Sequence, residues 1–119
     1  MSEERKYDLE ERTEKFSIRV RDLCRLLKQD IINREYIIQL IRAAGSVGAN
    51  YIEANDKLGE KDLRFRIRIS KKEAKETKYW LKHIMTYDVI ELEEQRLILL
   101  QEADELMKIF AAILRKLGD

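Results

Sequence analysis

The 119-residue sequence contains no proline and only four glycines. The residues that interrupt secondary structure and build the turns of β-rich folds are therefore scarce, which argues against a sandwich or a barrel. No apolar run approaches the roughly 20 residues that a membrane-spanning helix needs. Cysteine occurs once, at Cys24, which excludes an intrachain disulfide and favours a reducing cytoplasm as the setting.

Helix-forming residues dominate the composition. Charged residues make up 39% of the chain and hydrophobic residues 45%, and Glu, Lys, Arg, Leu, Ile and Ala lose little on entering a helix. Apolar residues recur at steps of three and four, and the links between such segments are short, so neighbouring helices should be antiparallel. We therefore expect one all-α domain over residues 1–119, an antiparallel up-and-down four-helix bundle with helices at 9–28, 34–56, 61–87 and 91–117.

The helix ends and core seams follow from the same periodicity. Asn33 is the expected N-cap of the second helix, and Gly118 is the expected C-cap of the fourth. The expected seams are Ile37, Ile41, Ala44, Gly48 and Tyr51 in the second helix, and Ile67, Ser70, Ala74, Thr77, Leu81 and Ile84 in the third.

The second segment contains the unusual stretch 43–50, Ala-Ala-Gly-Ser-Val-Gly-Ala-Asn. A phosphate-binding glycine loop would require a Gly-Lys-Ser/Thr ending, which is missing here. The alternative is a helix that is thin enough for a neighbouring helix to approach closely. Each interior glycine costs a helix about 1 kcal/mol relative to alanine, so close packing must compensate for Gly45 and Gly48. We favour the packed helix.

Polar residues of the second and third segments suggest a shared network. A di-iron bundle site would need Glu-x-x-His from two helices, but the chain has one histidine, His83, and Trp80 stands three residues before it. We therefore expect neither a metal nor another cofactor. We expect instead a buried or interfacial network in which Arg42 and Asn50 satisfy glutamates; its members are Arg42, Ser46, Asn50, Glu53, Glu73 and Glu76.

Catalytic residues are hard to find in this sequence. Cys24 lies on an amphipathic helix and is expected to be a core or boundary residue, and nothing places a serine beside His83. We therefore expect no enzymatic activity. Tyr79 and Trp80 are expected in the core or at a subunit interface, and the interface is favoured for Trp80 because large aromatic residues anchor interfaces.

Two sequence blocks carry a family resemblance. Residues 39–54 resemble a signature of the bacterial four-helix bundle proteins encoded in 23S ribosomal RNA intervening sequences, and residues 72–81 resemble that family's second signature. The similarity extends over 16–114. It implies a homo-oligomer, with a ring-shaped pentamer favoured, no enzymatic activity, and binding of RNA or DNA. Related bundles are accessory subunits of reverse transcriptases in diversity-generating retroelements.

The sequence departs from the family pattern at three positions. Gly45 stands where a larger aliphatic residue is common, Leu63 where phenylalanine is common, and Lys72 where an acid is common. The first departure should loosen the second helix, and the last makes the third segment more basic.

The third segment carries what we call the basic stripe, seven cations at steps of three and four: Lys61, Arg64, Arg68, Lys71, Lys75, Lys78 and Lys82. We expect it opposite the face of Ile67, Ala74 and Leu81. Like charges at this spacing repel, which suggests a neutralising partner such as a phosphate backbone. The alternatives are a solvated surface, or a contact with acids of the fourth segment in the same or another chain: Asp88, Glu91, Glu93, Glu94, Glu102, Asp104 and Glu105.

The stripe determines the functional hypothesis. No aromatic residues interleave with its cations, which argues against base stacking and predicts backbone binding with little sequence preference. The sequence thus predicts a non-enzymatic, homo-oligomeric bundle that binds RNA or DNA through the stripe. The alternative is a protein-interaction scaffold, such as an accessory subunit of a reverse transcriptase.

Overall fold

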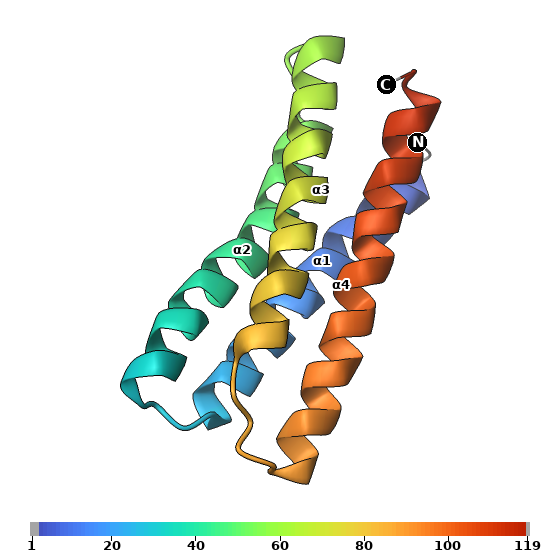
Figure 1. The fold of residues 1–119 in the computed structure, drawn as a ribbon. Helices are drawn as coiled ribbons and strands as arrows, with labels where there is room; N and C mark the ends of the chain where they lie inside the picture. The colour runs from blue at the N-terminus through green and yellow to red at the C-terminus, as the bar shows by residue number, and fades with distance from the viewer. Residues whose placement is uncertain (1–2, 119) are drawn as a thin grey trace.

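The computed structural model describes residues 3–118, with side chains from residue 8 onward. It contains four helices: α1 (Glu3–Leu26), α2 (Ile31–Asn55), α3 (Glu60–His83) and α4 (Ile90–Lys116). Successive helices run in opposite directions, and the α1–α2 and α3–α4 connections lie at the same end (Figure 1). The fold is the predicted antiparallel up-and-down four-helix bundle. No helix in the described part of the chain is long and apolar enough to cross a membrane.

All four helices contribute to one hydrophobic core. Its largest fully buried side chains include Phe16 of α1, Tyr51 of α2, Ile67 of α3 and Phe110 of α4. The seam predicted for α3 is correct, because each of its six residues is buried. The seam predicted for α2 is wrong at Ile41, which is 43% exposed.

The glycines of α2 differ in how closely α1 approaches them. A Cβ atom added at Gly48 would lie 2.9 Å from Oγ1 of Thr13 and 3.1 Å from its Cβ. A Cβ atom at Gly45 would meet Ser17 Oγ at 3.8 Å, which is an ordinary contact. The thin stretch is therefore a continuous helix against which α1 packs closely at Gly48, as the second interpretation predicted.

Asn33 does not cap α2 as expected. The N-cap is Asp30, whose side chain accepts a hydrogen bond from the backbone N–H of Asn33. The Asn33 side chain is fully buried and donates to the carbonyl oxygens of Lys28 and Met85, while its own oxygen accepts from the Met85 N–H. Asn33 thus joins the two loops at one end of the bundle.

Helix α3 ends at His83, earlier than the predicted Tyr87. The next residue, Ile84, is extended, with φ −55° and ψ 143°. Tyr87 and Asp88 adopt positive φ angles of 54° and 62°, and the Tyr87 hydroxyl donates to Asp30. This contact with the α1–α2 connection holds a loop conformation that non-glycine residues rarely adopt.

The remaining helix ends lie within about three residues of their predicted positions, except the start of α1. α1 begins at Glu3, earlier than the predicted residue 9. Gly59 lies in the predicted turn before α3 and has a φ of 148°. At the chain's end the C-cap of α4 is Leu117, and Gly118 follows it with a φ of 81°, the conformation that glycine adopts most readily.

Candidate nucleic-acid interface

The basic stripe runs along the edge of α3 that borders α4. Lys78 fixes this orientation, because its Nζ lies 2.7 Å from Oδ1 of Asp104 on α4. The stripe therefore flanks the core face and does not lie opposite to it as expected. Arg64 and Lys78 are half-buried, and the other members are exposed: Lys61, Arg68, Lys71, Lys75 and Lys82.

Asp104 neutralises one member of the stripe within the chain. Its carboxylate binds Lys78 and, at 2.9 Å, also Lys108. These hydrogen bonds, with Lys78 the stronger influence, lower the pKa of Asp104 to about 2. By contrast, Lys61, Lys71, Lys75 and Lys82 form no ion pair with any residue whose side chain is described. An acid of α4 therefore neutralises Lys78, whereas most cations of the stripe are not neutralised by α4.

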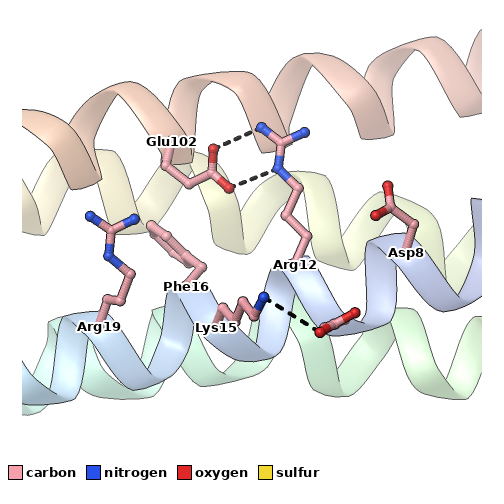
Figure 2. Close-up of a pocket in the computed structure, with 7 residues that line it drawn as sticks. Asp8, Arg12, Lys15, Phe16, Arg19 and Glu102 are labelled. Atoms are coloured by element: carbon pink, nitrogen blue, oxygen red, sulfur yellow. Dashed lines mark hydrogen bonds and ion pairs between the residues drawn. The ribbon is translucent and has the colours of Figure 1, made fainter.

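Another acid of α4 faces α1. Glu102 accepts two hydrogen bonds from the Arg12 guanidinium, at 2.8 and 2.7 Å, across a groove of about 280 Å³ between the two helices (Figure 2). On the α1 side of this groove, Lys15 pairs with Glu11 at 3.4 Å. Because these acids and cations neutralise one another, the groove has little net charge to attract an ionic ligand.

The predicted polar network forms only in part. Ser46 hydrogen-bonds to Glu73, and Asn50 accepts from Arg66 at 3.1 Å without contacting a glutamate. Both residues lie on the edge of α2 that faces α3. Arg42 and Glu53 are exposed and have no partner among the described side chains, because they lie farther around the helix.

Burial raises the pKa of Glu73. The second cause is the negative charge of Glu76, which is itself exposed, and the Lys72 charge and the Ser46 hydrogen bond oppose the shift. No Arg42 contact compensates Glu73 or Glu76 within the chain, so the expected role of Arg42 is not seen here.

The structure describes both candidate reactive residues, Cys24 and His83. Cys24 is 2% exposed, and burial raises the pKa of its thiol to about 12. The Nδ1 atom of His83 lies 2.7 Å from the carbonyl oxygen of Tyr79 at the end of α3. Within the described residues, no three His, Cys, Asp or Glu side chains form a group that could hold a metal ion.

Two exposed aromatic rings accompany the stripe, contrary to expectation. Phe65 and Tyr79 are 54% and 55% exposed and lie on the outer surface of α3. Their sequence signal was direct, since Phe65 stands between Arg64 and Arg66, and Tyr79 follows Lys78. The expectation that no aromatic residues interleave with the cations was therefore wrong.

Comparisons with known proteins give one family match and a similar solved structure. A family model described as 23S rRNA-intervening sequence protein matches residues 5–112. A crystal structure of a protein of unknown function from the S23 ribosomal protein family of Bacteroides thetaiotaomicron is similar, with a TM-score of 0.71 and 26% sequence identity. The match covers 88% of this chain and 96% of that one. Among functionally curated proteins, none matches the chain.

Proposed function

Because the chain belongs to the 23S rRNA-intervening sequence protein family, we propose that it is a non-enzymatic, homo-oligomeric bundle that binds RNA or DNA through the basic stripe. The observation that carries this proposal is the set of exposed lysines on α3 without acidic partners in the described chain: Lys61, Lys71, Lys75 and Lys82. Maintaining like charges at helical spacing costs some stability, and a polyanion would remove that repulsion.

The binding would depend mainly on the nucleic-acid backbone. Lysine ammonium groups contact phosphates as point charges and release condensed counterions. Affinity should therefore fall steeply with salt and depend little on sequence.

A charge-matched pair of variants tests the stripe. The first replaces Lys71, Lys75 and Lys82 with glutamine and spares Lys78, whose bond to Asp104 supports the bundle. The control replaces three exposed lysines elsewhere, Lys15, Lys57 and Lys116. Both variants lose the same net charge, so any difference between them reports position.

The measurement is fluorescence anisotropy of labelled RNA and DNA at several salt concentrations. We expect the stripe variant to lose affinity and its salt slope to fall by about 0.9 for each lost duplex phosphate contact. The control variant should retain most of its affinity and most of its salt slope. Equal affinity of the wild type and the stripe variant would refute the assignment.

Self-association is the second part of the proposal, with a pentamer favoured. It is supported by apolar side chains that α2 leaves uncovered: Ile38, Ile41 and Ile52 are each at least 43% exposed. They lie on a different helix from the stripe, so assembly through α2 would leave the cations open. Sedimentation velocity would test this proposal, and a monomer at all concentrations would contradict it.

A second candidate function, docking on a protein such as a reverse transcriptase, is supported by the bundle end that carries the α1–α2 and α3–α4 connections. Leu26, Ile31 and Ile90 are each about 70% exposed there. A protein partner would bury this apolar surface. Co-expression with a reverse transcriptase from the same genome, with Ile31→Ser and Ile90→Ser as variants, tests it. Failure of the wild type to co-elute with the enzyme would count against this role.

A further inference from the structure

Four aromatic side chains form a cluster on the outer surface of the α2–α3 pair. Tyr36 of α2 contacts Trp80 and His83 of α3, with ring centroids 6.0 and 5.4 Å apart. Tyr79 packs against the same two residues, with ring centroids 4.9 Å from Trp80 and 4.3 Å from His83. Tyr79 is the most exposed ring of the cluster, because the other three are half-buried.

Tyr79 borders the basic stripe. Lys75 precedes it by one helical turn and Lys82 follows it by nearly one turn, and both lysines are exposed. Glu76 is the one acid of α3 within four residues of Tyr79. The surface around the ring therefore combines an apolar face with an excess of positive charge.

The lysines bear on which kind of partner this surface fits. Protein–protein interfaces are depleted in lysine, whereas sites for single-stranded nucleic acid combine cations that follow the backbone with aromatic rings on which bases stack. In a continuous duplex the base faces are already stacked on one another, so no base face is free to stack on the Tyr79 ring. A single strand or a loop can turn a base outward.

Resting on the function proposed above, we infer that Tyr79 is a stacking platform for an unpaired base, and that the partner of the stripe is single-stranded or looped nucleic acid. The contacts with Trp80 and His83 hold the Tyr79 ring in place before binding. A ring held in this way loses less conformational freedom when a base stacks on it.

Two substitutions at one position separate the ring from the rest of the side chain. Tyr79→Leu removes the aromatic face and keeps an apolar side chain, and Tyr79→Phe keeps the face and removes the hydroxyl. Each variant is measured by anisotropy against a labelled single strand and a duplex of the same length. Tyr79→Leu should weaken single-strand binding roughly 5- to 100-fold, with duplex binding unchanged, and Tyr79→Phe should bind like the wild type.

Trp80 provides an independent signal, because it is the chain's one tryptophan and its ring contacts that of Tyr79. A base stacked on Tyr79 should change the Trp80 emission, and the same duplex should leave it nearly constant. Circular dichroism of both variants confirms that the helices are intact.

The possible outcomes distinguish this inference from the proposed function. If the wild type binds both nucleic acids and Tyr79→Leu weakens neither, the stacking role is wrong and the stripe remains. If the wild type binds neither, the proposed function fails as well. If Tyr79→Leu changes the sedimentation coefficient and leaves single-strand affinity intact, the cluster is a contact between protein chains, which also overturns the inference.

Discussion

Gly48 of α2 lies against Thr13 of α1 so closely that a Cβ atom on Gly48 would come within 2.9 Å of the threonine hydroxyl. Thr13 is 1% exposed, and its hydroxyl donates to the carbonyl of Glu10. The threonine therefore cannot turn away without breaking this hydrogen bond. We expect Gly48→Ala to destabilise the bundle by about 1 kcal/mol net, since overpacking outweighs the gain in helix propensity.

Gly45→Ala is the matched control for this prediction. Its new methyl group would meet Ser17 at an ordinary distance, so the helix-propensity gain of up to about 1 kcal/mol should dominate. Urea denaturation of the two variants should therefore shift the free energy of unfolding in opposite directions. A Gly48→Ala variant as stable as Gly45→Ala would show that α1 does not pack this closely.

Asn33 supplies the second prediction. Its buried amide satisfies two carbonyl oxygens and the Met85 N–H, so Asn33→Ala would leave all three groups without a partner. We expect a loss of about 2–3 kcal/mol in the free energy of unfolding, measured by thermal or urea denaturation. Asn50→Ala is the control, because the Asn50 amide donates to the carbonyl of Ser46 in its own helix and accepts one bond from the partly exposed Arg66, so it should change stability less. Equal losses in the two variants would contradict the bridging role of Asn33.

Periodicity predicted the helices well where one face alone is apolar. Five of the six buried positions of α3 were predicted because the rest of that helix is largely polar, and Leu63 was the one left out. The Ile-Ile-Gln-Leu-Ile run at 37–41 has apolar residues on more than one face, so spacing could not decide between Leu40, which is buried, and Ile41, which is exposed. The C-terminal end of α3 and the role of Asn33 depend on contacts between distant loops, which local sequence does not record.

The basic stripe was also predictable only in part. Its membership follows from spacing, and its position beside α4 became evident only through the Lys78–Asp104 pair. The predicted polar network contained more residues than the structure brings together, because helical spacing alone does not show which residues reach a neighbouring helix. Arg42, Ser46, Asn50 and Glu53 share one side of α2, but that side is wide, and only its α3 edge reaches a partner. The aromatic cluster was missed because Tyr36 comes from another helix.

Cys24 gives a prediction about reactivity. Its thiol is buried and has a pKa raised to about 12, so the nucleophilic thiolate is scarce at neutral pH. We expect a maleimide to label the native protein very slowly and the urea-unfolded protein rapidly, as followed by mass spectrometry. Rapid labelling of the folded chain would place Cys24 at an accessible surface and contradict its position in the core.

Asp104 predicts how stability depends on pH. Its pKa is about 2 in the folded chain, below the ordinary 3.8, so the ionised form is favoured by folding. The resulting stabilisation is fully present above about pH 4 and is lost as the pH falls through about 2. Asp104→Asn should therefore be less stable than the wild type at neutral pH, and the two should converge in acid. Urea denaturation across this range tests the prediction, and a difference that persists at the lowest pH would contradict it.

Asp104→Asn also changes the stripe, because it releases Lys78 from its carboxylate partner. The freed Lys78 ammonium group adds a cation to the surface beside Lys75 and Lys82, and Lys108 of α4 loses the same carboxylate partner, so nucleic-acid affinity and its salt slope should both increase while stability decreases. Asp22→Asn removes the same charge from an exposed residue of α1 and should raise affinity less. Opposite effects of one substitution on stability and binding would indicate that Asp104 and a phosphate compete for Lys78. Equal gains from both variants would indicate a response to net charge alone.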